Sequence, residues 1–341
     1  MKMYQYIIRR LLLLIPVLLG VTILIFALTR IGGDPAAAYI TVRMTPAQIA
    51  EVKEIHGFNE PVYIQYLYYM ADLLRGDWGI SKASQDMPVL DVVKLRLPAT
   101  IELTIVAMTL ATVIGIPLGV ISATKKDKWP DHVTRLFALS GVSIPIFWLG
   151  FLMQYVFFYL LKTNGLPYLP LYGRATASMY PPHVTGFFTL DSIIAGNGLM
   201  FLDVISHLVM PAFCLCYTSL AEISRMTRSS MLEVMGQDYI RTARAKGLSE
   251  RKVVYKHALR NALIPTVTII GLSFGALLAG AVLTETIFNW PGVGSWAAES
   301  IVRIDTAAIV GFTILVAVMY TIVNLIVDLL YAYLDPRVRL E

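Results

Sequence analysis

Residues 11–28 read LLLLIPVLLGVTILIFAL, a run of eighteen residues without a charged side chain. A helix needs about 20 mostly apolar residues to cross a lipid bilayer. A signal peptide has the same basic start, here Lys2, Arg9 and Arg10, and residues 36–38 are three alanines of the kind found at cleavage sites. Its apolar core is only about 7–15 residues long. We therefore interpret the run as an uncleaved membrane anchor.

The composition of the whole chain agrees with a membrane protein. Hydrophobic residues make up 57% of the 341 residues and charged residues 15%, against about 25% charged residues in soluble domains. This composition argues against a soluble enzyme and excludes a disordered chain. Five further apolar runs follow the first, and the fourth run is the weakest because His207 and Pro211 interrupt it. The predicted fold is an all-α membrane protein with six transmembrane helices, at residues 11–28, 101–121, 136–161, 204–223, 262–284 and 307–330.

The distribution of lysine and arginine predicts the orientation. With the N-terminus inside, the cytoplasmic segments hold 18 of the 28 Lys and Arg residues, in accord with the basic excess of cytoplasmic loops. Both termini are then cytoplasmic, residues 29–98 and 162–203 form outer loops, and residues 225–261 form a long inner loop within one transmembrane domain, residues 1–341. Because topology accounts for the basic charge, we do not expect nucleic-acid binding.

The large first outer loop contains signals for short helices. Thr45-Pro46-Ala47-Gln48 is a capping box with proline at the first helical position, which predicts a helix to about His56. A second helix is expected from residues 59–61 to a stop at Gly76. These helices either cap the spans or contact a partner outside the cell, and we favour the cap. In the second outer loop, residues 190–194 predict a short helix.

The long inner loop has a distinctive pattern. Residues 225–265 read RMTRSSMLEVMGQDYIRTARAKGLSERKVVYKHALRNALIP. A basic helix is predicted to about Lys246, Gly247 breaks it, and Ser249 can cap a second helix. Such a pair of helices can lie along the membrane surface or fit a groove in a partner protein. The pattern by itself does not separate these two interpretations.

One catalytic pattern occurs, in the fifth span. Residues 271–275, Gly-Leu-Ser-Phe-Gly, match G-x-S-x-G, but a nucleophile elbow needs a strand before the serine and a helix after it. The two glycines also form the G-x-x-x-G pattern of closely packed membrane helices. We favour helix packing over an intramembrane serine protease, for which His207 is the only histidine near a span.

Other candidate chemical groups have structural interpretations. The five histidines lack metal-ligand spacing, so no metal site is predicted. Cys214 and Cys216 are interpreted as small core residues. Glu102 is expected in the first turn of the second span, where a helix dipole favours a carboxylate. An ion pair is expected between Glu222 and Arg225, three residues apart on one helix.

In the inner loop the sequence resembles the permease subunits of binding-protein-dependent ABC importers, which carry a cytoplasmic Glu-Ala-Ala-x-x-x-Gly motif. Residues 241–247, Arg-Thr-Ala-Arg-Ala-Lys-Gly, match this motif in frame, with Arg and Thr in place of Glu and Ala. The family's later Leu-Pro falls on Leu259-Arg260, and Pro265 comes five residues later. These departures are typical of the dipeptide/oligopeptide branch. Residues 33–35, 76–81, 143–148, 185–191, 285–294 and 324–339 also resemble that branch.

The resemblance implies a type I ABC importer permease fold in the cell (inner) membrane, with this chain forming half of the translocation path. It implies four partners: a homologous second permease subunit, two ATP-binding subunits and an extracytoplasmic substrate-binding protein. The chain would be neither an enzyme nor a cofactor protein, because ATP and Mg are bound by the partner subunits. The branch also carries oligosaccharides and nickel, which remain alternative substrates to peptides. A stand-alone channel is the alternative from another class.

An energy-coupling site follows from what the chain lacks. It has no G-x-x-x-x-G-K-[ST] phosphate-binding loop, so energy must enter through a contact on the inner face, and only the long inner loop can present folded structure there. We expect Gly247 to bend this loop with a positive φ. The expected coupling residues are Arg241, Thr242, Ala243, Arg244, Lys246, Gly247, Leu248, Arg251 and Val253, with Leu248 and Val253 giving apolar contact.

Two further sites are expected along the path. The fifth span carries small residues, which leave room beside a helix, so Ser273, Ala276 and Gly280 are expected to line the translocation path. The turn at Pro291-Gly292 follows an aromatic pair. We expect Phe288, Trp290 and Pro291 to form an outer gate, with Trp290 at the membrane surface. An ordinary surface anchor is the alternative for this turn.

Overall fold

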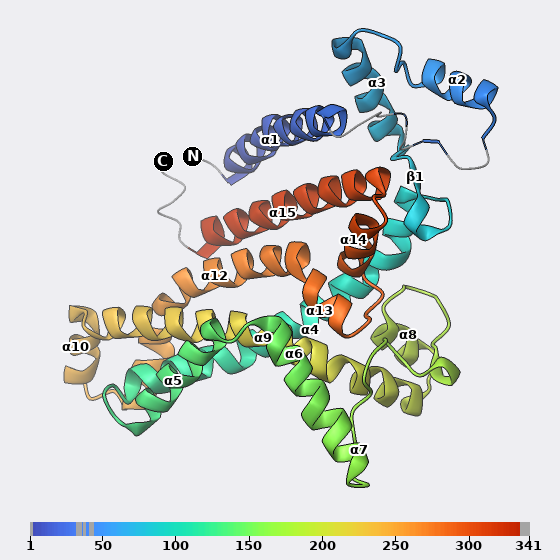
Figure 1. Ribbon diagram of the computed structural model, residues 1–341. Helices are drawn as coiled ribbons and strands as arrows, with labels where there is room; N and C mark the ends of the chain where they lie inside the picture. Colours follow the sequence, from blue (N-terminus) through green and yellow to red (C-terminus); the bar gives the residue numbers. More distant parts are fainter. Residues whose placement is uncertain (1–2, 32–35, 37–38, 41–43, 335–341) are drawn as a thin grey trace.

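The computed structural model describes residues 3–31, 36, 39–40 and 44–334 (Figure 1). Residues 33–35 and 335–339, which carry part of the resemblance, lie outside these ranges. Six helices in the described ranges are long and apolar enough to cross a membrane, so the predicted all-α membrane protein with six spans is confirmed. These candidate spans are Leu11–Arg30, Val89–Thr124, Ile146–Thr163, Gly198–Met235, Glu250–Leu278 and Thr306–Leu330.

Short elements separate the first two long helices. The predicted capping box is present, with Gln48 Oε1 accepting from Thr45 N at 2.8 Å. Gly76, at φ +85°, ends the second short helix as expected. An antiparallel pair of two-residue strands then leads into the second span. In order, the elements are α1 (Met3–Ile31), α2 (Pro46–Ile55), α3 (Val62–Arg75), β1 (Ile80–Ser81), η2 (Lys82–Ser84), β2 (Met87–Pro88) and α4 (Val89–Thr124).

The third apolar run is broken into pieces. Pro145 disfavours helical backbone at the preceding residue, and Ile144 is indeed extended. Residues 136–161, which we expected to be one span, therefore belong to two helices that meet at this proline, and a π-helical segment follows the second. The pieces are α5 (Trp129–Ser143), α6 (Ile146–Gln154), η3 (Tyr155–Leu160) and α7 (Leu161–Thr163).

The second half of the chain holds three long helices and several short ones. The possible helix at residues 190–194 is present as α8. The fifth apolar run, residues 262–284, fills most of α12 and extends into the short helix α13, and α14 follows before the last span. In order, the elements are η4 (Ala177–Met179), α8 (Phe188–Ile194), α9 (Gly198–Met235), α10 (Asp238–Ala245), α11 (Glu250–Lys252), η5 (Val253–Ala258), α12 (Leu259–Gly280), α13 (Val282–Ile287), α14 (Val293–Val302) and α15 (Thr306–Leu334).

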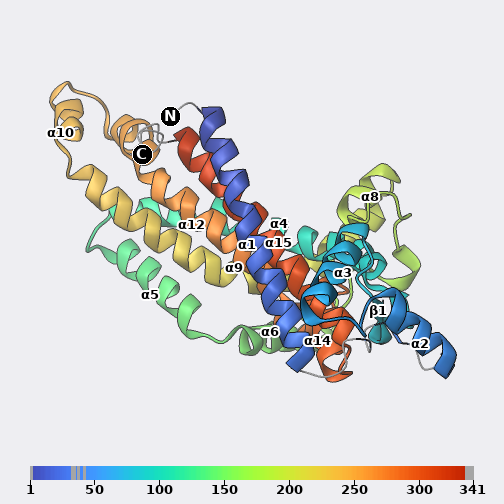
Figure 2. The ribbon, with the colours of Figure 1, turned by 90° about the horizontal axis from the view of Figure 1, so that it is seen from above.

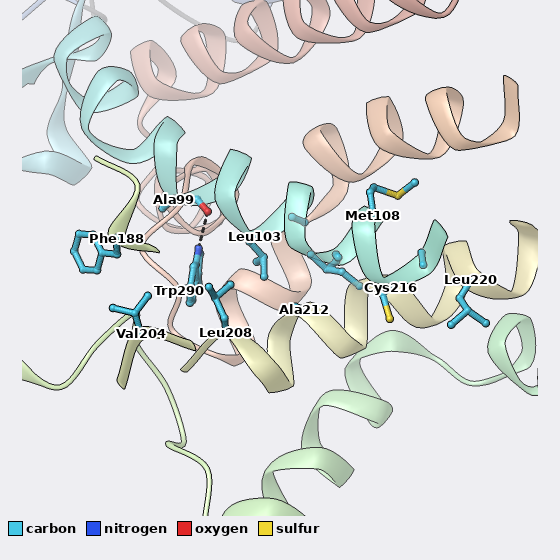
Figure 3. Packing of buried hydrophobic residues seen from close by; sticks show 14 of the residues in the cluster. Ala99, Leu103, Met108, Phe188, Val204, Leu208, Ala212, Cys216, Leu220 and Trp290 are labelled. Atoms are coloured by element: carbon cyan, nitrogen blue, oxygen red, sulfur yellow. Dashed lines mark hydrogen bonds between the residues drawn. The ribbon is translucent and has the colours of Figure 1, made fainter. Parts of the chain in front are cut away.

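Helices α4 and α9 pack against each other at the centre of the molecule. Small residues let them approach closely: a Cβ atom at Gly119 would lie 2.5 Å from Cβ of Thr227. Figure 3 shows side chains of both helices interdigitating, with Trp290 beside them. Cys214 and Cys216 are buried and free, which confirms their interpretation as core residues.

The two ends of the molecule differ. Helix α10 lies at one end, and the start of α1 and the end of α15 point toward that same end (Figures 1 and 2). Elements α2, α3 and α8 lie at the opposite end. Helix α3 packs on α1 there, with Tyr66 edge-on to Phe26 at 5.2 Å between ring centroids. The expected coupling segment therefore lies at one end of the helical body, and the short helices of the outer loops lie at the other.

Candidate functional site

The segment from α10 to α11 is a folded bend. Helix α10 ends at Ala245, Lys246 follows, and Gly247 has φ +74°. A Cβ atom at Gly247 would meet no heavy atom within 4 Å. The backbone conformation, and not a lack of space, therefore accounts for glycine here, since other residues adopt positive φ at a cost of about 1–2 kcal/mol.

A buried apolar platform holds this bend in place. Ile240 of α10 and Val253 of η5 are both fully buried. They pack in one cluster with Val120 of α4 and Met231 of α9. Val253, which we expected to contact a partner, instead supports the segment from inside. Ala243 is also buried, because it lies on the same side of α10 as Ile240.

The outer surface of the bend is basic and aromatic. Arg244 donates to Glu250 across the bend at 2.6 and 3.1 Å, which links α10 to α11. Leu248 is half-buried. Tyr239 and Tyr255 are exposed aromatic residues that sequence reasoning missed, and both lie next to buried residues in the inner-loop pattern. The expected coupling residues that are exposed are Arg241, Thr242, Arg244, Lys246, Gly247 and Arg251.

Helix α12 packs one face on α15. A Cβ atom at Gly271 would lie 2.0 Å from Val327 Cγ2, and one at Gly275 would lie 3.3 Å from Tyr320 and Val323. The G-x-S-x-G pattern is therefore a packing motif, as interpreted.

Of the three residues of α12 expected to line the path, one is buried and one is exposed. Ser273 is 8% exposed and donates to Glu222 of α9 at 3.2 Å, and no histidine bonds to it in the described ranges. Ala276 is exposed. Gly280 ends the helix, and its surroundings lie outside the described residues. The ion pair expected between Glu222 and Arg225 is not formed, since Glu222 turns to Ser273 on the neighbouring helix.

The turn after α13 is buried and not interfacial. Trp290 has no exposed surface and donates through Nε1 to the carbonyl of Ala99 at 2.9 Å (Figure 3). Phe288 is also buried, against Leu149 and neighbouring residues. The expectation of Trp290 at the membrane surface is wrong, because α4 supplies a carbonyl for its N–H in the core. Pro291 is exposed.

A buried carboxylate organises this turn. Glu285 Oε1 accepts from the Thr100 hydroxyl at 2.6 Å, and Oε2 accepts from Ser295 N, in the first turn of α14, at 2.8 Å. A Cβ atom at Gly292 would lie 2.3 Å from Oε1, so only glycine leaves room for the carboxylate. Burial raises the pKa of Glu285 to about 7. In the sequence, this residue stands out only as part of the stretch 285–294.

A second buried carboxylate ties the outer-loop segment to α4. Because α4 begins at Val89, Glu102 lies well inside the helix, and the expectation of a first-turn carboxylate is wrong. Glu102 pairs with Arg174 and accepts from the amide and hydroxyl of Thr189, both at 2.7 Å. Arg174 also lies over the Phe188 ring, at 3.8 Å from its centroid. The segment that includes α8 is thereby fastened to the central helices.

Fold and sites together define a multi-pass α-helical membrane protein with a folded basic segment at one end and a buried, polar-braced turn beyond its fifth span. In the described ranges, no group of His, Cys, Asp and Glu could hold a metal ion. Comparison with protein families then identifies the class further. Residues 115–340 match the family "binding-protein-dependent transport system inner membrane component", and residues 3–104 match the N-terminal model of such components. The chain belongs to this family, as its resemblance indicated.

Individual relatives match over the full length of the chain. It is 45% identical over 338 residues to the dipeptide transport system permease protein DppB of Alkalihalophilus pseudofirmus, covering 99% of this chain and 100% of that protein. It is 44% identical to DppB of Escherichia coli K12, covering 99% of each. It is 39% identical to the oligopeptide transport system permease protein AppB of Bacillus subtilis, covering 99% and 100%. The chain is therefore a transport subunit and not an enzyme.

Proposed function

We propose that the chain is one permease subunit of an ATP-driven importer for dipeptides and short oligopeptides. The observation that carries this proposal is the 45% identity to a dipeptide permease over 99% of this chain. A homologous second permease completes the translocation path, two ATP-binding subunits supply the energy, and a substrate-binding protein delivers the peptide outside. Oligosaccharides and nickel are disfavoured as substrates, because these relatives are named for peptides.

The bend around Gly247 is the proposed coupling element, on the cytoplasmic side of the membrane. Its support comes from two properties. The buried platform of Ile240 and Val253 makes the bend rigid enough to transmit a displacement to α4 and α9. The exposed Arg241, Lys246 and Arg251 offer charge to acidic groups of an ATP-binding subunit. The exposed aromatic rings of Tyr239 and Tyr255 offer the apolar contact that we had expected from Val253.

The exposed face of α12 and the turn after α13 are the other parts of the proposal. Ala276 faces the path shared with the second permease subunit. Trp290 and Glu285 hold the turn so that exposed Asn289 and Pro291 meet the binding protein or close the path. The buried side chains thus position the turn, while the exposed ones make the contact.

Replacement of Gly247 by Val tests the coupling element. Valine is β-branched and strained at positive φ, whereas asparagine tolerates the left-handed conformation. We expect the Gly247→Val complex to assemble in the membrane but to lose most dipeptide import and to bind the ATP-binding subunits more weakly. Gly247→Asn should retain most of the import.

Import of a labelled dipeptide into proteoliposomes, with subunit composition measured by size-exclusion chromatography, provides the readout. Unlabelled peptide, oligosaccharide and nickel serve as competitors. A fully assembled Gly247→Val complex that imports at the normal rate would show that the bend does not couple ATP to transport. Competition by an oligosaccharide or nickel, but not by peptides, would overturn the substrate assignment.

A further inference from the structure

A basic cavity between α5 and α9 has no part in the function proposed above. Its volume is about 330 Å³, and its lining includes Arg135 and Leu139 of α5 and Arg225, Arg228 and Ser229 of α9. A single water molecule needs only about 10–15 Å³ of such space. The cavity can therefore hold a polar group much larger than a single ion.

Two of the three arginines that line the cavity have no acidic partner among the described residues. Arg228 is paired, since its Nε and Nη2 each donate at 2.8 Å to the fully buried carboxylate of Asp131. These hydrogen bonds hold the pKa of Asp131 well below its usual range, so this pair is neutral overall. Arg135 and Arg225 form no ion pair within the described residues. The cavity therefore presents two positive charges.

The donors around the cavity suit a phosphate group. Guanidinium groups present planar pairs of N–H donors that match phosphate oxygens. The hydroxyls of Ser224 and Ser229 lie in the same lining and add further donors. A phosphodiester has one negative charge and two free oxygens, and its two substituents need the space that the cavity provides.

An exposed apolar stripe on α5 leads away from the cavity. Its residues recur every three or four positions, so they share one helix face, and Leu139 belongs both to the stripe and to the cavity lining. Trp129, at the start of the stripe, is an aromatic residue of the kind enriched where a membrane meets water. The stripe consists of Trp129, Val133, Leu136, Leu139 and Val142, which are 43–78% exposed.

We propose that this cavity binds the phosphodiester headgroup of an anionic phospholipid, whose acyl chains lie along the α5 stripe. The combination of net positive charge, volume and an adjoining apolar surface favours a lipid over free phosphate, because free phosphate would use neither the volume nor the stripe. Basic pockets between transmembrane helices are recognised sites for anionic headgroups. The inference does not depend on which solute the importer carries.

Lipid binding to the assembled complex tests the proposal. Delipidated complex is titrated with phosphatidylglycerol, phosphatidylcholine or inorganic phosphate, and retained molecules are counted by native mass spectrometry. We expect phosphatidylglycerol to bind at least about tenfold more tightly than phosphatidylcholine. Each basic residue contributes about a fivefold factor to such binding, so Arg135→Gln/Arg225→Gln should weaken it about 25-fold.

Two further variants test whether selective binding depends on charge inside the cavity. Lys252→Gln removes an exposed charge outside the cavity and should bind phosphatidylglycerol like the wild type. Ser229→Glu places a negative charge in the lining without touching the Arg228–Asp131 pair, and it should also abolish selective binding.

Four results would overturn the proposal. One is equal binding of the two lipids, and another is selective binding that survives both cavity variants. The third is selective binding to the isolated subunit that disappears in the assembled complex, which would make this face an interface between subunits. Binding of inorganic phosphate as tight as that of phosphatidylglycerol would assign the cavity to the free anion instead.

Discussion

Glu285 illustrates how one side chain accounts for a stretch of sequence. Its carboxylate accepts from Thr100 of α4 and from the first turn of α14, and it occupies the space that a side chain at position 292 would need. The glycine at 292 is therefore required by the acid. Trp290, between them, bonds to α4 as well. Residues 285–294 therefore form a turn that its own buried side chains hold in place.

The titration of Glu285 predicts a pH dependence of stability. Burial raises the pKa of Glu285 in the folded state from 4.5 to about 7. The folded chain therefore binds the carboxyl proton more tightly than the unfolded chain does. Its contribution to stability is full below about pH 4.5 and is lost as the pH rises through about 7. We expect the unfolding temperature of the purified subunit to fall between about pH 5 and pH 8.

The matched comparison is Glu285→Gln, measured by thermal unfolding in the same detergent across that range. Both proteins share every other titrating group, so the difference between the two curves isolates this carboxyl. The wild-type curve should descend more steeply than that of Glu285→Gln. Parallel curves would contradict the assignment of a raised pKa to Glu285.

At the scale of elements, close approach of α12 and α15 depends on one glycine. A methyl group at Gly271 would lie 2.0 Å from Val327 Cγ2, and a valine in a helix has little freedom to rotate away. We expect Gly271→Ala to destabilise the subunit by about 1–3 kcal/mol through overpacking. Gly275→Ala, whose contacts would be 3.3 Å or longer, should cost much less.

A compensating variant makes this prediction specific. Gly271→Ala/Val327→Ala removes the methyl groups that clash and should recover part of the lost stability, measured by thermal unfolding in detergent. If Gly271→Ala is as stable as the wild type, the two helices are able to separate without cost, and the packing interpretation fails.

At the scale of the whole molecule, the proposed path can be tested by accessibility. Ala276 is exposed on α12, whereas the native Cys214 and Cys216 are buried and should give little background. We expect a cysteine at Ala276, and more weakly one at Ser273, to react with a water-soluble thiol reagent at a rate that depends on the nucleotide state. Ala111→Cys, in the fully buried core, is the matched control.

The complex is labelled without nucleotide, with ATP and with a trapped ATP-binding state, and the reaction is followed by mass spectrometry. A cysteine at position 276 that stays as inert as Ala111→Cys in every state would place α12 away from the water-filled path. Equal reactivity in all states would mean that the path does not alternate at this position.

Much of the molecule could be predicted from local sequence. The six spans follow from apolar length, which makes a spanning helix whatever its neighbours are. The capping box at Thr45, the helix stop at Gly76 and the bend at Gly247 are equally local, because each depends on the backbone of a few adjacent residues. The break at Pro145 was also readable in principle, from the steric clash of proline with the preceding residue.

Only the tertiary structure decided which side chains are buried and what they contact. Glu102 bonds to a residue 72 positions away, and Trp290 bonds to one 191 positions away. Val253 faces inward because α4 and α9 meet beneath it. Amphipathic pattern fixes a helix and its apolar face, but an apolar face can be covered by lipid, by a partner or by the chain itself. Which of these covers it depends on long-range packing, and that packing leaves no local signal in the sequence.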